Sequence, residues 1–295
     1  MFHENAEEFG IPYEGPPTVH RRAVPVGPGR ALSSLVWGEG PAELVLLHGG
    51  AQNAHTWDTV ALAIGRPLVA VDLPGHGHSD GGRSGVLNIA DQADDVATAL
   101  DLLAPSAGAV VGMSLGGLAA IVLAARRPEL VRRLVLVDIT PGVDEGKASA
   151  IASFVGGPES FASFDEILAR TVAFNPTRSE QSLRRGILHN ALQREDGTWV
   201  WRYARFHTGL DRPSTGADRP STDLAALWEQ LGSLSVPVML VRGTRPQSVV
   251  DDADEAELLR RLPHARVEHL DAGHSVQGDR PVELAALLAD FLADG

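Results

Sequence analysis

The sequence predicts an α/β protein in which helices cover both faces of a mostly parallel β-sheet. Short apolar segments alternate with helix-like segments through the first half of the chain, which is the pattern of parallel strands joined by crossover helices. The strand-like segments are almost entirely apolar, as expected for strands that are buried on both faces. In addition, a G-x-S-x-G pentapeptide stands between one such segment and an apolar helix. We therefore expect one main α/β core.

Six segments have the character of buried strands, and four others place apolar residues at helical spacing. The strands are predicted at residues 42–48, 67–72, 109–112, 134–138, 236–241 and 265–270. The helices are predicted at residues 89–103, 115–127, 252–262 and 282–292. Ahead of them, residues 18–24 and 31–37 favour an antiparallel edge joined by a turn at residues 27–29.

The strand pattern stops after Asp138 and returns near residue 236, which predicts a mostly helical insertion at residues 141–235. The core would then consist of residues 1–140 and 236–295. Within the insertion, the sequence DRPST occurs at residues 211–215 and again at 218–222, which we interpret as a duplicated surface loop.

The insertion also concentrates aromatic side chains, which form either its own core or the wall of a pocket. They are Phe154, Phe161, Phe164, Phe174, Trp199, Trp201, Tyr203 and Phe206. Arg202 and Arg205 are candidates for pairing with an anionic substrate, although charged helix residues are usually solvated.

Composition limits the classes of partner. The formal net charge is −13, whereas nucleic acids and anionic membranes are bound by clustered lysine and arginine, so we expect a small-molecule substrate and neither of those partners. The chain has no cysteine, which excludes disulfides, thiolate metal sites and a cysteine nucleophile. The acidic N-terminal stretch and the lack of a long apolar segment predict a cytoplasmic protein. The oligomeric state stays open.

The pentapeptide at residues 112–116 reads Gly-Met-Ser-Leu-Gly and makes Ser114 the candidate nucleophile. A serine on a tight, strained turn between strand and helix needs neighbours without a Cβ atom, because backbone and helix approach each other closely there. Gly117 relieves the crowding further. The context predicts that the Ser114 hydroxyl points outward from the bend.

A second glycine-rich loop, His48-Gly49-Gly50, follows the strand that should lie beside the strand of Ser114. Such a loop can direct a backbone N–H at the negative charge that develops on a carbonyl oxygen under attack. We predict that the N–H groups of Gly50 and Leu115 form this oxyanion hole. His48 is expected to brace the loop.

The segment from Asp72 to Ser79 reads DLPGHGHS and is rich in turn-forming residues. Asp72, His76 and His78 are of the residue types that bind metal ions. Their spacing, however, is neither that of a helix nor that of a hairpin and would not bring the side chains together. We therefore interpret the segment as a turn and predict no metal site.

Taken in order, HGG, DLPGHGHS, GMSLGG and a late AGH resemble the α/β-hydrolase superfamily over most of the chain. The resemblance implies an eight-stranded, mostly parallel sheet with a helical cap inserted after the sixth strand. It also implies a triad of serine, acid and histidine at the carboxyl ends of the strands. The cap would correspond to residues 141–235.

The same resemblance makes His274 the candidate general base. It follows Asp271-Ala272-Gly273 directly after the last strand, on a loop that can reach over the serine. An imidazole can accept the serine proton and return it to the leaving group. His264 and His269 are weaker candidates, because one precedes the last strand and the other lies within it.

The acid of the triad is less clearly marked. Most relatives carry it shortly after the seventh strand, where this chain has no carboxylate between residues 243 and 248. Asp138 at the end of the sixth strand is our first candidate, because some members of the superfamily use an acid there. Asp251 and Asp252 are the alternatives, although they have the character of helix-capping residues. The acid's task is to orient the imidazole and to stabilise its protonated form.

These residues predict a carboxylic-ester hydrolase that works through an acyl-enzyme intermediate and needs no cofactor. The alternatives with the same triad are cleavage of a carbon–carbon bond, a lactone or an amide, and perhydrolysis. A ligand-binding member of the superfamily without turnover is an alternative from another class. The sequence leaves the acyl and alcohol groups of the substrate unknown.

Overall fold

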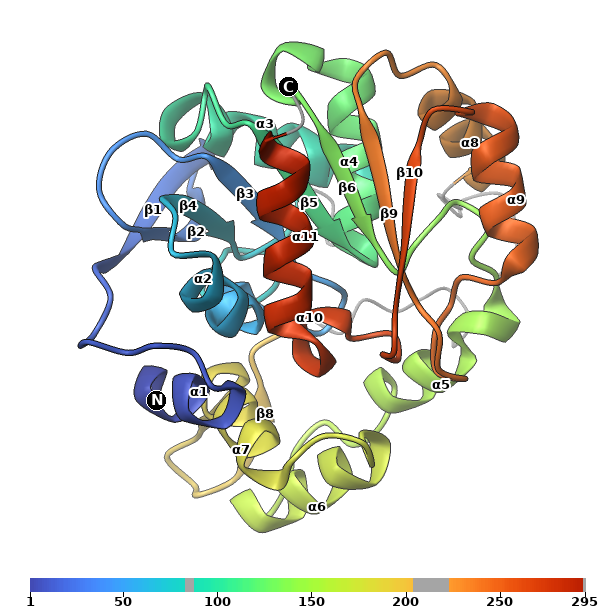
Figure 1. Cartoon of the computed structure of the whole chain (residues 1–295). Helices are drawn as coiled ribbons and strands as arrows, with labels where there is room; N and C mark the ends of the chain where they lie inside the picture. Colours follow the sequence, from blue (N-terminus) through green and yellow to red (C-terminus); the bar gives the residue numbers. More distant parts are fainter. Residues whose placement is uncertain (83–87, 204–222, 294–295) are drawn as a thin grey trace.

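The protein is described here by a computed structural model that covers residues 1–82, 88–203 and 223–293. Its centre is an eight-stranded sheet with the strand order β1-β2-β4-β3-β5-β6-β9-β10 (Figure 1). The strands are β1 (Val19–Gly27), β2 (Arg30–Trp37), β3 (Leu44–Leu47), β4 (Leu68–Val71), β5 (Ala109–Met113), β6 (Leu134–Val137), β9 (Val238–Gly243) and β10 (Arg266–Leu270). The predicted fold class is confirmed.

The pairing of the strands follows their composition. The four central strands β4, β3, β5 and β6 pair in parallel and are buried at every position. They are rich in valine and leucine, which suit a strand covered on both faces. The strand β2 runs antiparallel to both β4 and β1, so the predicted antiparallel edge is confirmed.

Two layers of helices enclose the sheet. One layer packs on one face and consists of α3 (Ile89–Leu103), α4 (Leu115–Arg126), α8 (Leu224–Gly232) and α9 (Asp252–Arg261). The other layer consists of α2 (Asp58–Ile64), α10 (Val276–Asp279) and α11 (Pro281–Ala293), with α2 and α11 in front of the sheet in Figure 1. The short helices η1 (Ala54–Trp57) and η2 (Pro128–Leu130) lie in the connections. No helix among the described residues has the length and apolarity needed to cross a bilayer.

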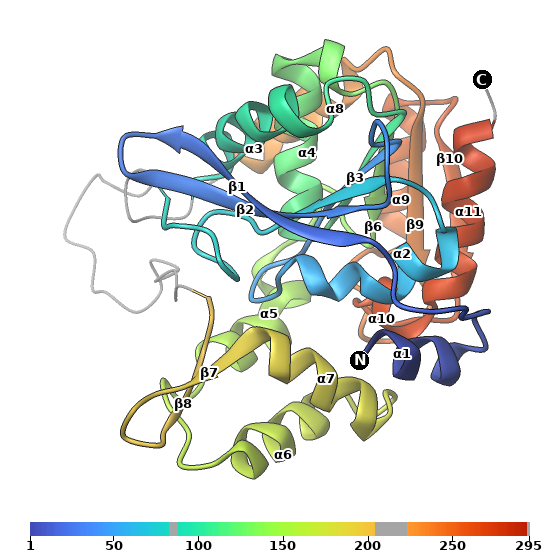
Figure 2. The ribbon, with the colours of Figure 1, turned by 90° about the vertical axis from the view of Figure 1, so that its left-hand side faces the viewer.

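Between β6 and β9 the chain leaves the sheet and forms a separate group of elements (Figure 2). They are α5 (Glu145–Val155), α6 (Phe164–Phe174), α7 (Glu180–Asn190) and the hairpin of β7 (Ala191–Gln193) and β8 (Trp199–Trp201), which was not predicted. The last helix of this segment, α8, packs instead on α4 through the main core. Both copies of DRPST lie outside the described residues.

The N-terminal helix α1 (Phe2–Phe9) connects the insertion to the rest of the chain and was not predicted. It lies beside α7 in both views (Figures 1 and 2). The buried side chain of Arg185 on α7 donates from Nε to Asn5 Oδ1 at 2.6 Å and pairs with Glu8. Since a buried guanidinium requires such partners, α1 and α7 are held together.

The start of α4 passes very close to the ends of β3 and β5. A Cβ atom added at Gly112 would lie 2.5 Å from the carbonyl oxygen of Gly116, and one added at Gly116 would lie 2.5 Å from that of Leu47. The Gly116 N–H donates to the carbonyl oxygen of His48 at 3.1 Å. The glycines of the pentapeptide therefore permit a backbone crossing that no other residue allows.

Substitution of Gly116 by alanine should destabilise the fold, because the new methyl group meets backbone atoms that cannot turn away. We expect a loss of about 1–3 kcal/mol in the free energy of unfolding, measured by urea denaturation. Gly186→Ala on α7 is the matched control, since no atom lies within 4 Å of the added methyl group. That variant should gain roughly 0.5–1 kcal/mol from helix propensity. Equal stability of the two variants would contradict the close crossing.

Candidate active site

Ser114 occupies the bend between β5 and α4 in a strained backbone conformation. Its φ is 50° and its ψ is −119°, values that a residue with a Cβ atom rarely adopts. The bend is fixed from both sides: the Ser114 N–H donates to the carbonyl oxygen of Val137, and the Ser114 carbonyl accepts from Gly117 and Leu118. Strain of this kind persists only where the surrounding structure determines it, and it is frequent at functional sites.

His274 and Asp138 come together from two loops that are far apart in the sequence. The imidazole Nδ1 lies 2.9 Å from Asp138 Oδ2. Asp138 directly follows β6 and is fully buried, whereas the side chain of His274, on the loop after β10, is 14% exposed. This hydrogen bond occupies Nδ1, so Nε2 is the ring nitrogen left for proton transfer.

Three further donors surround the Asp138 carboxylate, one from the last residue of β9 and two from the loop that follows it. The Gly243 N–H lies 2.9 Å from Oδ1, Ser248 Oγ lies 2.6 Å from Oδ1, and the Val249 N–H lies 3.1 Å from Oδ2. A buried carboxylate is tolerated when its oxygens accept such bonds. The loop that lacks a carboxylate therefore supplies donors to Asp138 instead. Sequence reasoning missed Ser248, because a single serine in a loop has no spacing that marks it.

Asp251 and Asp252, the alternative acids, have other partners. Asp251 caps α9, where its side chain accepts from the Asp254 N–H, and it pairs with Lys147 at 2.9 Å. Asp252 is almost fully exposed and pairs with Arg242. The helix-capping interpretation of Asp251 therefore describes its contacts, and His274 is bonded to Asp138 rather than to either of them.

Ser114 and His274 both line one large cavity, about 890 Å³ in volume, between the sheet and the insertion. A cavity of this size can enclose a small organic ligand. No hydrogen bond joins Ser114 Oγ to the imidazole in the part of the chain that the structure describes. Hydrogen bonds between catalytic groups often tighten only when substrate is bound. The two side chains line the same cavity, where a ligand could contact both.

The loop after β3 lies directly against the serine. A Cβ atom added at Gly49 would lie 3.2 Å from Ser114 Cβ and 2.4 Å from Met113 Sδ. Gly50 lines the cavity, and Leu115 begins α4 immediately after Ser114. Within the described residues, neither the Gly50 N–H nor the Leu115 N–H has a hydrogen-bond acceptor, so both are available to a ligand.

Two buried histidines hold this loop to the loop after β4. His48 Nδ1 donates to its neighbouring carbonyl at Gly49, and His48 Nε2 accepts the Leu73 N–H at 2.9 Å. His76 Nε2 accepts the Ala51 N–H at 3.1 Å. Burial lowers the pKa of both rings, that of His76 to about 3, helped by the neighbouring His48. These contacts agree with the bracing role predicted for His48.

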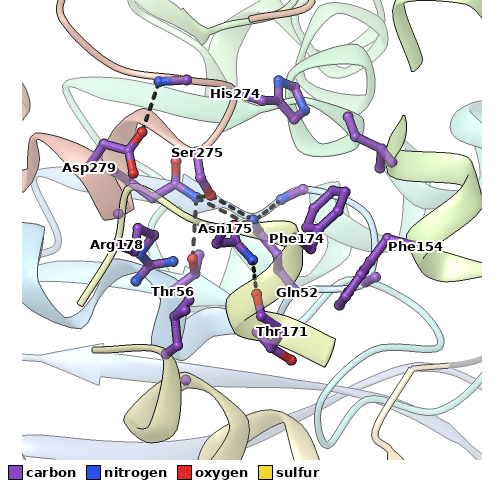
Figure 3. Close-up of a pocket in the computed structure, with 18 of the residues that line it drawn as sticks. Gln52, Thr56, Phe154, Thr171, Phe174, Asn175, Arg178, His274, Ser275 and Asp279 are labelled. Atoms are coloured by element: carbon purple, nitrogen blue, oxygen red, sulfur yellow. Dashed lines mark hydrogen bonds between the residues drawn. The ribbon is translucent and has the colours of Figure 1, made fainter. Parts of the chain in front are cut away.

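Polar side chains also join the loop of His274 to the loop after β3 (Figure 3). Gln52 Nε2 donates to Ser275 Oγ at 3.2 Å, and Gln277 Nε2 donates both to Gln52 Oε1 and to Thr56 Oγ1 at 3.2 Å. Because Ser275 is the neighbour of His274, this network fixes the approach of the imidazole to the Gly49–Gly50 loop. No motif or spacing marks these residues in the sequence, since they are isolated polar positions in loops and short helices.

The remaining residues of the turn after β4 have structural partners. Asp72 accepts from the Ala54 N–H at 2.7 Å and the His78 N–H at 3.1 Å, and it pairs with Arg21 at 2.9 Å. Burial alone would raise the pKa of Asp72, but these donors outweigh it and the pKa is lowered. The carboxylate therefore organises the turn.

The aromatic residues of the insertion divide into two groups. Those that line the cavity are Phe154, Phe174, Trp201 and Tyr203, with the rings of Phe154 and Phe174 stacked at 4.3 Å (Figure 3). Those that pack mainly in the insertion's own core are Phe161, Phe164 and Trp199. Arg202 donates to the carbonyl oxygen of Ala191. Arg205 and Phe206 lie outside the described residues.

Comparison with known proteins identifies related chains. The family model described as "alpha/beta hydrolase fold" matches residues 43–281. The esterase Rv0045c of Mycobacterium tuberculosis is 45% identical over 98% of this chain and 93% of its own. A solved structure of that esterase, from work on its inhibition by transition metals, has a TM-score of 0.84 at 43% identity, with 99% of this chain and 97% of that chain covered. A pimeloyl-[acyl-carrier protein] methyl ester esterase of Sodalis glossinidius is 32% identical over 88% of this chain and 98% of its own.

The buried ring of His76 predicts a loss of stability in mild acid. An unfolded histidine takes up its proton near the ordinary pKa of 6.5, whereas folded His76 stays unprotonated down to about 3. Its contribution to the free energy of unfolding is complete above about pH 6.5 and decreases as the pH falls, by about 2 kcal/mol at about pH 5. Urea unfolding at both pH values measures this decrease. In His76→Gln, the free energy of unfolding should decrease less between these pH values, because the contribution of His76 is missing. An equally steep decrease in the variant would contradict this explanation.

Proposed function

Because the chain belongs to the α/β-hydrolase family, we propose that it is a serine hydrolase that cleaves carboxylic esters through an acyl-enzyme intermediate. One observation carries this proposal: the buried Asp138 carboxylate holds His274 by a 2.9 Å hydrogen bond at the cavity that Ser114 also lines. The esterase names of the similar chains favour ester cleavage over cleavage of a carbon–carbon bond, a lactone or an amide, over perhydrolysis and over ligand binding without turnover.

In the first half of the proposed reaction, Ser114 Oγ attacks the ester carbonyl carbon while His274 Nε2 accepts the hydroxyl proton. Asp138 keeps the Nδ1 proton of His274 in place and stabilises the imidazolium that forms. The imidazolium then donates its Nε2 proton to the alkoxy oxygen, the bond from carbon to that oxygen breaks, and the alcohol leaves. The acyl group stays on Ser114 as an ester.

The second half repeats these steps with water. His274 Nε2 takes a proton from a water molecule whose oxygen attacks the acyl carbon, and the imidazolium then returns a proton to Ser114 Oγ as the carboxylic acid leaves. In both halves, the Gly50 and Leu115 N–H groups would stabilise the negative carbonyl oxygen. Loss of one such donor typically lowers turnover by about 10²–10³-fold.

The substrate is proposed to be a small molecule that enters the cavity between sheet and insertion. The stacked rings of Phe154 and Phe174 supply an apolar wall, whereas Gln52 and Thr56 supply polar contacts near the loop of His274. This mixture is typical of sites that bind an apolar acyl group next to a polar ester. A cytoplasmic location stays a prediction of the sequence.

The nucleophile is tested by Ser114→Ala. Hydrolysis of short p-nitrophenyl esters should fall by on the order of 10⁶-fold, since the step that forms the acyl-enzyme is lost. A fluorophosphonate probe should label the wild-type chain at Ser114 and leave the variant unlabelled. Circular dichroism should find both chains folded. Wild-type turnover in the variant, or labelling of another residue, would contradict the proposal.

The acid is tested by Asp138→Asn, with Asp251→Asn as the matched control. The amide cannot hold the imidazole in the same tautomer, so kcat for ester hydrolysis should fall by on the order of 10⁴-fold. Asp251 caps a helix that is not joined to His274, and because asparagine caps helices as well as aspartate does, its variant should keep kcat within a few-fold and stay folded. The reverse order of effects would assign the acid to Asp251.

A further inference from the structure

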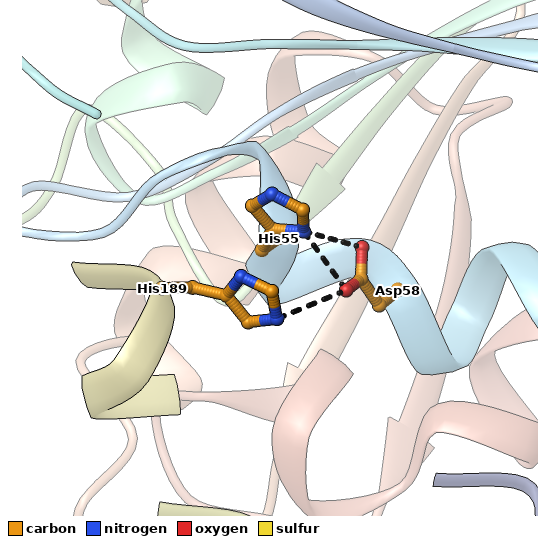
Figure 4. A group of neighbouring side chains, drawn as sticks. All are labelled: His55, Asp58 and His189. Carbon is orange, nitrogen blue, oxygen red and sulfur yellow. Dashed lines mark hydrogen bonds and ion pairs between the residues drawn. The ribbon is translucent and has the colours of Figure 1, made fainter. Parts of the chain in front are cut away.

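The cavity that Ser114 and His274 line also contains a second cluster of titratable side chains. His55 in η1 and Asp58 at the start of α2 belong to the core, whereas His189 in the last turn of α7 belongs to the insertion (Figure 4). His55 Nδ1 lies 3.0 Å from Asp58 Oδ2, and His189 Nε2 lies 3.8 Å from the same oxygen. Asp58 is buried and the two rings are partly buried.

We propose that His55, Asp58 and His189 bind a divalent transition-metal ion such as Zn²⁺, and that the bound ion ties α7 to the core. Two imidazoles and one carboxylate are a ligand set that suits Zn²⁺, Co²⁺ or Ni²⁺. Around a tetrahedral ion with bonds of about 2.0–2.2 Å, ligand atoms lie roughly 3.3–3.6 Å apart. The distances of 3.0 and 3.8 Å in the cluster bracket this range.

The His189 ring can move to accommodate a metal ion, because it makes few polar contacts. Among the described residues, its ring makes no hydrogen bond, and it lies 3.8 Å from Asp58 Oδ2. The rings of His55 and His189 are stacked at 3.7 Å with their planes 13° apart, so one ring must tilt to direct its lone pair at a shared ion. His189 can make this adjustment without breaking a hydrogen bond of its own. The cavity supplies space for water as a further ligand.

Arg21 opposes binding of a cation at this cluster. Its Nη2 lies 2.9 Å from His55 Nε2, and because arginine can only donate, His55 carries its proton on Nδ1. When a metal ion binds at Nδ1, the ring proton must be carried on Nε2, which then becomes a donor and requires Arg21 to move away. The same guanidinium also binds Ser33 and Asp72 through Nη1 and is about one-third exposed, so Nη2 can turn toward water. Arg21 therefore lowers the affinity of the site for a cation without blocking the ligand atoms.

The ligands are tested by calorimetric titration of Zn²⁺ into the tag-free chain, a readout that does not depend on hydrolysis. The wild-type chain should bind one equivalent, and His189→Gln and Asp58→Asn should each weaken the affinity at least about tenfold. Arg21→Gln should tighten it, because a competing positive charge is removed. His20→Gln, at an exposed position on β1, is the matched control and should bind as the wild type does. Visible absorption of bound Co²⁺ should report tetrahedral geometry in the wild type and in His20→Gln, and this signal should be lost in His189→Gln and Asp58→Asn.

Unchanged affinity in both ligand variants would overturn the assignment, as would loss of binding in His274→Gln with retention in His189→Gln, which would place the ion at the Asp138–His274 pair. Should Asp58→Asn fail to fold, the affinity of His189→Gln alone decides the assignment.

The tie between α7 and the core is tested by amide hydrogen exchange. Zn²⁺ should slow exchange over residues 180–190 in the wild type and not in His189→Gln, and equal exchange with and without bound Zn²⁺ in the wild type would overturn it.

Discussion

The arrangement of the site depends on one buried charge, the carboxylate of Asp138. A carboxylate removed from water must have hydrogen-bond donors, and here they come from His274, from the end of β9 and from two positions of the loop after it. The carboxyl ends of three neighbouring strands, β6, β9 and β10, are therefore joined at one point. Because these strands are parallel and end at the same edge of the sheet, satisfying this single group also orients the imidazole above that edge.

A second set of contacts joins the loop of His274 to the loop that follows β3. Gln52 and Gln277 connect Ser275 to Thr56, while His48 and His76 hold the same loop to the turn after β4. Hydrogen bonds of this kind restrict the conformations that the joined loops can adopt. The glycine loop and the imidazole are thus supported through neighbouring residues.

The core of the fold could be predicted because its signals are local. The helix at residues 89–103 was predicted with the bounds of α3, and the strands of the sheet were predicted within two residues at each end, except that β1 continues three residues further, since periodicity and glycine or proline boundaries mark them. Helix α1 and the β7–β8 hairpin were missed, because they are short and depend on contacts with other elements, α1 through Arg185 on α7 and the hairpin within the insertion. Within the site, Ser114 and His274 have motifs around them, whereas Ser248 and Gln52 act only through contacts that the folded chain creates.

Helix α1 determines which segments must be kept together when this chain is shortened or recombined with a relative. The family match begins at residue 43, yet Asn5 and Glu8 are the partners of the buried guanidinium of Arg185 on α7. A shortened or chimeric chain built from the matched region alone would lack both acceptors of that guanidinium. Helix α1 and the insertion are therefore coupled through this contact. Exchange of the insertion between relatives requires both segments to be transferred together.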